Sequence, residues 1–451
     1  MKYNISYISA IVLHILIGML LYFNESLAKL YFAIILFFFM YRIVTAPDSL
    51  KSFEVLKACA YFVGAEVLLR MTKGSISYEG SKYLVILFMM IGMFYKGISG
   101  RAYPYFIYLL FLVPSIFVAS TTLSFDANFR TNITFVLSGP VCLGMCALFA
   151  FNKKITNKQF SDVLLYMVLP IIAHTAYVYL YTPSIRDVLS STASNRAASG
   201  GFGPNQVATV LGLGMFIMTV RLFTKSPNLG LKILNTTLLI LISFRAVVTF
   251  SRGGVITAIL AIAAFLIFYF FKVSKRKKNE ILFVLLIFLG SLVVTWTISS
   301  KETDGFIDLR YANKDHLGRE KEDLTTGRKT LFLNELDGFI RRPFLGIGSS
   351  RAKDRRIEIE GQGVTSHSEV SRILAEHGIL GVLILLILFF KPFDIRSNNK
   401  SNYFFYAFLC FWFMTINHSS MRIAAPAFIY ALSLITITYD KPSLHRKQLK
   451  N

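Results

Sequence analysis

Apolar residues fill long runs of the chain, and short polar segments separate these runs. Residues 34–40, 84–93, 255–271 and 281–294 are examples, and with their neighbours such runs reach about 20 residues. A helix of that length crosses the ~30 Å hydrocarbon core of a membrane. Fourteen such runs are centred near residues 14, 36, 61, 90, 112, 141, 171, 213, 239, 262, 289, 384, 409 and 431. The pattern predicts an all-α polytopic membrane protein with about 12–14 transmembrane helices.

Two of these predicted spans contain charged residues. The third holds Glu54, Lys57 and Glu66, and the ninth holds Arg245. Because a charge that faces lipid is costly, we expect these two helices to be tilted or to line a polar cavity.

Composition agrees with a membrane protein and excludes several other classes. Hydrophobic residues make up 54% of the 451 residues and charged residues only 16%, whereas soluble domains carry about 25% charged residues. A net charge of +23 would indicate nucleic acid in a soluble protein, but here the basic residues lie in loops, and we expect no nucleic-acid partner. All four cysteines lie inside apolar segments and are predicted to be packing residues without disulfides.

The positions of lysine and arginine predict how the chain is oriented. The densest basic cluster is 272–278, and the C-terminal tail is also basic. Since basic residues are enriched on the cytoplasmic side, both termini are predicted to be cytoplasmic. We expect the first apolar run to be a signal anchor, because no small-residue cleavage site follows it.

One segment is long and polar. Residues 300–376 form a stretch of 77 residues on the outer side with balanced charge, and a loop of that length without structure of its own would be unusual. An amphipathic helix is predicted over 326–342, with Phe332, Leu336, Phe339 and Ile340 near one face and Pro343 ending it. A second helix is predicted to begin near residue 366 and to run toward the membrane at residue 378. The segment is therefore predicted to be a partly helical periplasmic cap.

These features divide the chain into three parts. Residues 1–299 are predicted to form transmembrane helices 1–11, residues 300–376 the cap, and residues 377–451 transmembrane helices 12–14 with a cytoplasmic tail.

Polar residues that suit chemistry gather in four places on the outer side. They are Arg196 in the glycine-rich loop before a helix, Arg252 in the Ser-Arg-Gly-Gly of 251–254, Arg328 at the start of the cap helix, and His367 near the start of the second cap helix. Each has a structural alternative: a plain loop, an interfacial arginine, a solvated arginine and a packed histidine. Three arginines and a histidine on one side of the membrane favour a substrate with phosphate groups and a hydroxyl to be deprotonated.

Motifs for other chemistries are missing from the sequence. It has no His-Glu-x-x-His, no Cys-x-x-Cys, no Walker sequence and no dinucleotide-binding fingerprint. We therefore expect no metal and no cofactor. Sugar nucleotides are cytoplasmic and the candidate residues lie outside, so the sequence favours a lipid-borne donor.

The four motifs together resemble those of the O-antigen ligase and O-antigen polymerase family. They are RAASGGFGPNQ at 196–206, SRGG at 251–254, TGR at 326–328 followed by RRPFLGIGS, and SHSEVSRILAEHGILG at 366–381, in the usual order of that family. The resemblance covers roughly residues 194–381, less than half of the chain.

The resemblance implies a bacterial inner-membrane glycosyltransferase of the GT-C type. Such enzymes move a glycan from undecaprenyl pyrophosphate to an acceptor hydroxyl on the periplasmic face, without metal and with inversion. By motif, Arg196 and Arg328 look like the arginines that bind pyrophosphate, and His367 looks like the base that activates the acceptor. Arg252 matches a signature arginine, for which a pyrophosphate-binding and a structural role are both open. The family often has asparagine where this chain has Ser368, which puts the contact beside the base in doubt.

Several functions stay open within and beyond this class. A ligase transfers a finished glycan to lipid A-core, a polymerase joins repeat units, and a protein O-oligosaccharyltransferase transfers to serine or threonine. A flippase for lipid-linked oligosaccharide, or another multi-pass transporter, is the alternative from a different class. Such a transporter would carry charges within several spans rather than at one end.

Overall fold

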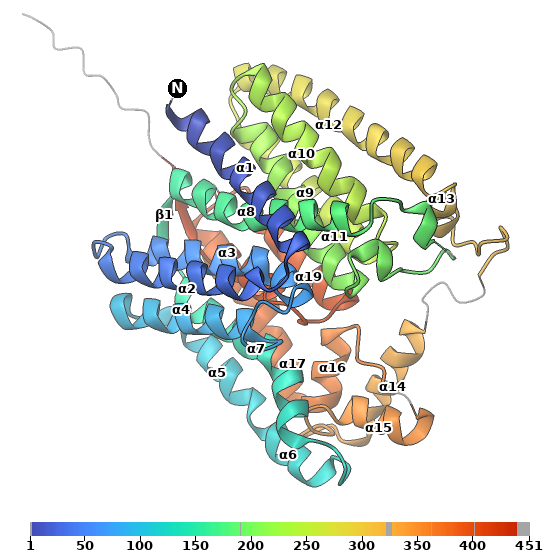
Figure 1. Cartoon of the computed structure of the whole chain (residues 1–451). Coiled ribbons are helices and arrows are strands. Elements are labelled where there is room, and N and C mark those ends of the chain that lie inside the picture. Colours follow the sequence, from blue (N-terminus) through green and yellow to red (C-terminus); the bar gives the residue numbers. More distant parts are fainter. Residues whose placement is uncertain (1, 190, 322–326, 362, 401, 440–451) are drawn as a thin grey trace, which may run out of the picture.

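The computed structural model describes residues 2–189, 191–321, 327–361, 363–400 and 402–439, and in this part the chain is almost entirely helical (Figure 1). The only two strands there, β1 (Lys154–Thr156) and β2 (Thr436–Thr438), pair in parallel, with Lys154 opposite Thr436. The C-terminal tail beyond residue 439, which the sequence places in the cytoplasm, lies outside the described residues. The all-α architecture is confirmed.

The helices of the first half lead up to residue 181. They are α1 (Lys2–Phe23), α2 (Leu27–Thr45), α3 (Lys51–Met71), α4 (Gly80–Lys96), η1 (Gly100–Ala102), α5 (Tyr103–Leu112), α6 (Pro114–Thr122), α7 (Phe129–Ala150) and α8 (Asn157–Tyr181).

The second half contains the remaining bundle helices and the cap. The bundle helices and two short turns are η2 (Arg186–Val188), η3 (Ala197–Ser199), α9 (Pro204–Thr224), α10 (Leu229–Val247), α11 (Arg252–Lys272), α12 (Lys275–Glu302), α17 (Ile379–Phe390), α18 (Pro392–Asn398), α19 (Phe405–His418) and α20 (Ala425–Ser433). The cap helices are α13 (Phe306–Tyr311), α14 (Arg328–Arg341), α15 (Arg351–Glu360) and α16 (Glu369–His377).

Eight helices in the described part are long and apolar enough to cross a membrane. Every one of the fourteen predicted centres falls inside a helix. The last three are shorter than predicted: α17 has 12 residues, α19 has 14 and α20 has 9. At 1.5 Å per residue α20 is only about 14 Å long, so it is too short to cross a membrane alone. The chain is a multi-pass membrane protein whose last helices are broken.

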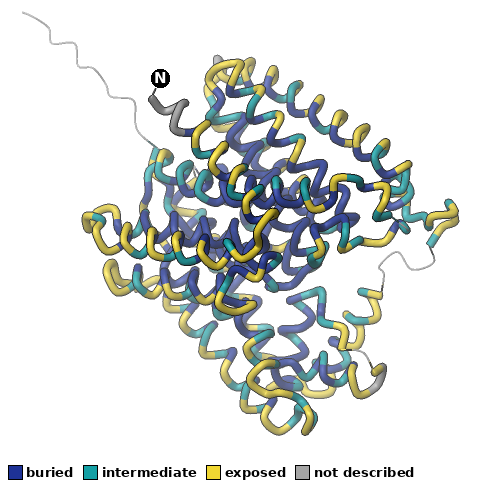
Figure 2. Tube along the Cα trace, in the orientation of Figure 1, coloured by how far each residue is buried: buried dark blue, intermediate teal, exposed yellow. Residues whose placement is uncertain are grey.

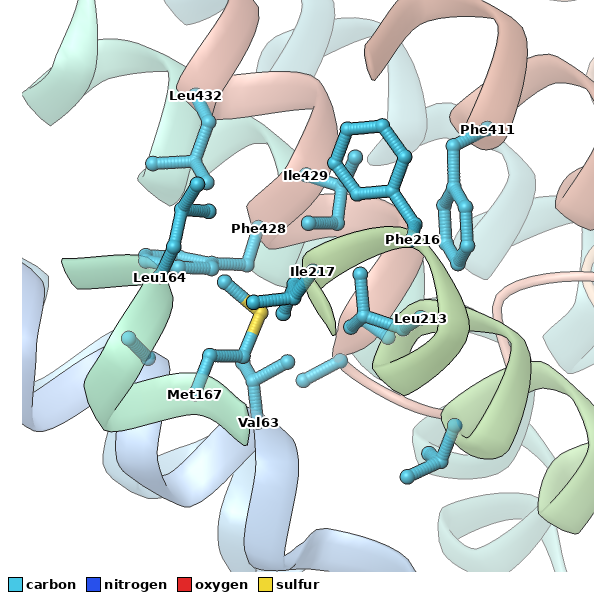
Figure 3. Close-up of a cluster of buried hydrophobic side chains, with 14 of the residues drawn as sticks. Val63, Leu164, Met167, Leu213, Phe216, Ile217, Phe411, Phe428, Ile429 and Leu432 are labelled. Carbon is cyan, nitrogen blue, oxygen red and sulfur yellow. The ribbon is translucent and has the colours of Figure 1, made fainter. Parts of the chain in front are cut away.

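The core of the bundle lies where α3, α8, α9, α19 and α20 meet. Figure 3 shows Val63, Met167, Phe216 and Phe428 from four of these helices packed side by side, and all four are buried. Side chains of α1, α2 and α12 are instead apolar and exposed along one side (Figure 2). Apolar residues on the outside of a bundle are expected where lipid is the solvent.

The charges in the third and ninth predicted spans are paired inside the protein. Glu54 forms ion pairs with Arg42 (2.9 Å) and Lys57 (2.7 Å). The guanidinium of Arg245 donates to the carbonyls of Tyr179 (3.3 Å) and Thr182 (2.9 Å). Partners within the bundle therefore lower the cost of placing these charges at membrane depth, and Nε and Nη1 of Arg245 have no hydrogen-bond partner among the described residues.

The cap departs from the predicted pattern in two ways. Helix α14 is close to the predicted helix, but Phe332 and Ile340 are exposed, and the face that packs contains Glu335 and Gly338. The other two apolar residues of the predicted face, Leu336 and Phe339, are half-buried, while Gly338 brings α14 close to α16 and Glu335 is held there by polar partners. His367 is not in the first turn of a helix, since α16 begins at Glu369 with the preceding serine as its N-cap. Helices α13 and α15 are absent from the prediction.

The cysteines follow the prediction. Cys59, Cys142 and Cys146 are buried, Cys410 is half-buried, and none of the four forms a disulfide.

Candidate active site

A cavity of about 660 Å³ lies between the cap and one end of the bundle. It is bordered by the N-terminal ends of α9 and α11, by α13 and α14, by the loop before α16 and by the C-terminal end of α19. Its lining residues are Ala193, Ser194, Asn205, Ser251, Arg252, Gly253, Arg310, Arg328, Lys329, Leu331, Phe332, Glu335, Ser366, His367, Ser368, Ser371 and Asn417. Arg252, Arg328 and His367, which lie far apart in the sequence, therefore share one cavity.

The Ser-Arg-Gly-Gly motif brings α11 close to its neighbours. Phe250 just before it has a φ of 58°, a left-handed conformation that turns the chain into the helix. The Ser251 hydroxyl donates to Asn205 Oδ1 at the start of α9 (2.6 Å). A Cβ on Gly253 would lie 2.5 Å from the ring of His418, and one on Gly254 would lie 2.5 Å from the backbone of α9. The two glycines thus allow the close packing that places Arg252 at the cavity.

Arg252 is held by the cap helix α13 and the turn after it. Its guanidinium donates to the carbonyl of Arg310 (3.3 Å) and to the side chain of Asn313. The Arg310 side chain in turn donates to the carbonyl of Phe250 (3.2 Å). This reciprocal contact fixes a second arginine beside the first.

Arg328 is the first residue of α14. Gly327 before it has a φ of 80°, which only glycine adopts readily, and this turn starts the helix at the cavity. Burial and the charge of Arg252 lower the pKa of the Arg328 guanidinium. Burial, Arg252 and Arg328 lower the pKa of Arg310 in the same way. Three arginines from three elements therefore repel one another across the cavity, which favours a bound anion.

The loop that carries His367 is clamped from two sides. Arg422, between α19 and α20, donates to the carbonyl of Ser366 (2.9 Å) and to the hydroxyl of Thr365 (2.5 Å). Ser420 donates its backbone N–H to the carbonyl of His367 (3.2 Å). The position of the imidazole is thus set by the segment between the last two bundle helices.

Glu335 of α14 holds the same loop from the cap side. Its carboxylate is buried and accepts from the hydroxyls of Ser371 (2.6 Å) and Ser366 (3.1 Å) and from Arg356 of α15 (3.2 Å). Burial raises the pKa of this carboxyl group. One side chain thereby joins α14, α15 and α16 around the histidine.

The environment of His367 favours the neutral imidazole. Burial, then the positive charges of Arg422 and Arg328, lower its pKa from 6.5 to about 4. A neutral imidazole has an unprotonated nitrogen, so at neutral pH His367 can accept a proton.

A buried ion cluster anchors α16 to the rest of the cap. Arg372 pairs with Glu369 and with Glu376 (2.6 Å), and all three are buried. Glu376 also accepts from the backbone N–H of Ser350 (2.9 Å), and Glu369 from that of Met421 (3.4 Å). The cluster ties the start of α15 and the segment before α20 to the helix that follows His367.

The glycine-rich loop has a different place from the one expected. Arg196 is exposed at the start of η3 and is outside the cavity lining, although Ala193 and Ser194 of the same loop line it. Gly200 and Gly201 have φ values of 68° and 76°, and Cβ atoms there would meet Met71 and Tyr181. The glycines shape the loop against the bundle, and a donor-binding role of Arg196 stays a prediction.

Several residues of the cavity are absent from the sequence-based prediction. Arg310, Glu335 and Asn417 line it, and Arg422 supports it. The Ser368 hydroxyl donates to Asn417 Oδ1 of α19 (3.1 Å), so a nearby helix supplies an amide beside His367. The charge of Arg422 between two apolar segments is a signal in the sequence, because such charges seldom lie there without a role.

Part of the chain matches a known protein family. Residues 237–386 match the model of the O-antigen ligase family. This stretch, about a third of the chain, is similar to O-antigen ligases. The matched stretch contains Arg252, Arg310, Arg328 and His367, whereas Arg196 and Arg422 lie outside it. No curated protein matches the chain.

The family match supports the resemblance over three of the four sequence motifs, and the motif at 196–206 lies outside it. An O-antigen ligase domain indicates an enzyme that transfers glycans, with a lipid-linked glycan and an acceptor as substrates. The chain is thus a multi-pass membrane protein whose residues 237–386 are similar to O-antigen ligases.

Proposed function

We propose that the protein transfers a glycan from undecaprenyl pyrophosphate to an acceptor hydroxyl at the cavity beneath the cap. The observation that carries the proposal is the meeting of Arg252, Arg310 and Arg328 with His367 in one cavity of about 660 Å³. The arginines come from α11, α13 and α14. A diphosphate offers the oxygens that several guanidinium groups bind together.

The arginines act on the leaving group. As the bond between the anomeric carbon and the pyrophosphate oxygen breaks, negative charge grows on the diphosphate. Arg252, Arg310 and Arg328 stabilise this charge, and their own mutual repulsion falls at the same time. Arg196 lies in the same loop as Ala193 and Ser194, which line the cavity, and it supplies a further cation, as its motif implies.

His367 acts on the acceptor. Its neutral imidazole accepts the proton of the acceptor hydroxyl while the oxygen attacks the anomeric carbon. Attack from the side opposite the leaving pyrophosphate inverts the anomeric centre. The products are the glycosylated acceptor and undecaprenyl pyrophosphate, and the imidazolium then releases its proton to solvent.

We infer that the reaction needs no metal, since guanidinium groups take the charge-stabilising role. The rate of transfer should be unchanged after treatment with excess chelator and should not rise when magnesium or manganese is added back. A rate that falls with chelator and returns with one of these ions contradicts this part of the proposal.

The proposed site faces the periplasm of a bacterium, with the protein in the inner membrane. The basic cluster at 272–278 supports this orientation because it lies at the opposite end of α11 and α12 from the cap. Leu317 in the cap is exposed, so Leu317→Cys should react with a membrane-impermeant thiol reagent when only the outer membrane is permeabilised. Labelling that needs a broken inner membrane contradicts the orientation.

A ligase, a polymerase and a protein O-oligosaccharyltransferase differ in the acceptor that they glycosylate. The function we propose is O-antigen ligase or polymerase, with lipid A-core or a growing glycan as acceptor. The test is purified protein in liposomes with an undecaprenyl-pyrophosphate-linked glycan and each acceptor in turn, with release of undecaprenyl pyrophosphate as readout. Release that depends on one acceptor supports the proposal and identifies the class. Movement of the donor between leaflets without release favours the flippase alternative.

A further inference from the structure

A second cavity of about 950 Å³ lies at the other end of the bundle. Helix α9 links the two cavities, since Asn205 at its start lines the first and Arg221 near its end lines the second. At 1.5 Å per residue these two positions are about 24 Å apart along the helix. The second cavity is therefore separate from the proposed active site and lies at the end with the basic cluster 272–278.

A buried arginine forms part of its wall. Arg221 is 8% exposed, and its Nε donates to the hydroxyl of Tyr7 (3.2 Å). Tyr7 in turn donates to Asn235 (2.6 Å), and Asn235 donates to Ser226 (2.7 Å). This network fixes the guanidinium in place.

The charge of Arg221 has no carboxylate partner among the described residues. In that part of the chain its two terminal nitrogens also make no hydrogen bond, and its guanidinium carbon lies 4.1 Å from the centroid of the Tyr7 ring. A mostly buried cation whose partners are a hydroxyl group and an aromatic ring keeps its charge uncompensated, which is costly. An anion in the cavity would remove that cost.

The rim of the cavity is positively charged. Besides Arg221 it contains Lys225, Lys232 and Lys277, against only two carboxylates, Asp162 and Glu280. Lys232 pairs with Glu280 at 3.9 Å. Four cations against two anions leave an excess of two positive charges at this end.

The deep part of the cavity is apolar and opens sideways. Leu13 of α1 and Phe38 of α2 line it and are 55% and 47% exposed on the outside of the bundle. Leu169 of α8 and Phe39 of α2 continue the apolar wall. A ligand here thus meets positive charge at the membrane surface and apolar side chains toward the membrane centre.

We propose that this cavity binds one anionic glycerophospholipid. Its phosphate contacts Arg221 and Lys225, and an acyl chain follows the apolar wall between α1 and α2. The charge excess selects an anionic headgroup over a zwitterionic one, and the side opening admits a chain from the surrounding leaflet. The proposal does not depend on the transfer reaction.

The test is native mass spectrometry of the purified protein in a neutral detergent. The probes are phosphatidylglycerol, phosphatidylcholine with the same chains, and glycerol 3-phosphate as the headgroup without chains. We expect one phosphatidylglycerol to bind at least about tenfold more tightly than phosphatidylcholine, because the quaternary ammonium of choline is repelled by the excess positive charge of the rim. Glycerol 3-phosphate should bind far more weakly than the lipid.

Variants separate this site from general attraction to a basic surface. Arg221→Gln and Lys225→Gln should each weaken phosphatidylglycerol binding, and Leu13→Trp should weaken it by filling the tail region. Lys272→Gln removes one charge at the same end, is exposed and is outside the lining, so it should bind like wild type. If Arg221→Gln does not fold, phosphatidylglycerol binding by Lys225→Gln and Leu13→Trp tests the proposal.

Three results would overturn the proposal. They are equal binding of the two lipids, equal loss in Lys272→Gln and Lys225→Gln, and binding of glycerol 3-phosphate as tight as that of the lipid. Displacement of phosphatidylglycerol by undecaprenyl phosphate at equal concentration would also contradict it, because the cavity would then prefer a polyprenyl chain.

Discussion

The pH dependence of transfer tests the role of His367 in detail. Burial and the charges of Arg422 and Arg328 lower the pKa of the imidazole from 6.5 to about 4, which corresponds to roughly 3 kcal/mol against the protonated form. Because the lowered pKa belongs to the free enzyme, kcat/KM should stay constant down to about pH 5 and fall only as the pH approaches about 4.

A bound diphosphate changes this value. Its negative charge offsets the arginines, so the pKa of His367 in the donor complex should rise, and the acid limb of kcat should lie at higher pH than that of kcat/KM. Removing one of the arginine charges that lower the pKa of His367 should also raise this pKa. Arg328→Ala should move the acid limb of kcat/KM to higher pH, in addition to lowering the rate.

The assay measures release of undecaprenyl pyrophosphate by purified protein in liposomes between pH 3.5 and pH 8. A control shows that the vesicles stay intact at the acid end of this range. Arg341→Ala is the matched control, because it removes an arginine from the exposed end of the same helix. The reasoning fails if wild type shows an acid limb of kcat/KM near 6.5, or if Arg328→Ala and Arg341→Ala have the same limb as wild type.

Two further predictions concern the supports of the site. Glu335→Gln leaves the buried Arg356 without its carboxylate partner, so the free energy of unfolding should fall by about 3 kcal/mol. Chemical unfolding measures this loss. A loss no larger than that of the exposed Asp337→Asn on the same helix would contradict the prediction. In Gly254→Ala the new methyl group would meet the backbone of Ala208 at 2.5 Å, so we expect a loss of about 1–3 kcal/mol and reduced transfer. Gly290→Ala in α12 has open space around it and should change neither stability nor transfer, and equal behaviour of the two variants would refute the packing argument.

The membrane helices could be predicted from the sequence because one physical requirement decides them. A helix in lipid needs about 20 apolar residues, and every predicted centre lies in a helix. Arg252, Arg328 and His367 could be found because each lies in a short polar motif beside an apolar run. That they meet in one cavity follows from tertiary packing, which the sequence pattern does not show.

The rest of the site depends on contacts between distant segments. Arg422 reaches Ser366 in the His367 loop across 56 positions of sequence, and no local periodicity reports such a contact. The packing face of α14 was predicted from its apolar residues, but Glu335 satisfies its charge with buried partners and Phe332 is exposed at the lining of the cavity. Hydrophobic patterning is a poor guide for a cap that lies beside a membrane, since apolar side chains there need not point inward.

A single-turnover titration of the lipid-linked donor tests the central account most directly, because one data set gives the donor dissociation constant and the transfer rate. For His367→Ala the account predicts a dissociation constant near that of wild type and no measurable transfer. For Arg328→Ala it predicts a loss of about 2–5 kcal/mol in transition-state stabilisation, with Arg341→Ala unchanged. Wild-type transfer by folded His367→Ala, or wild-type binding and transfer by folded Arg328→Ala, would contradict it.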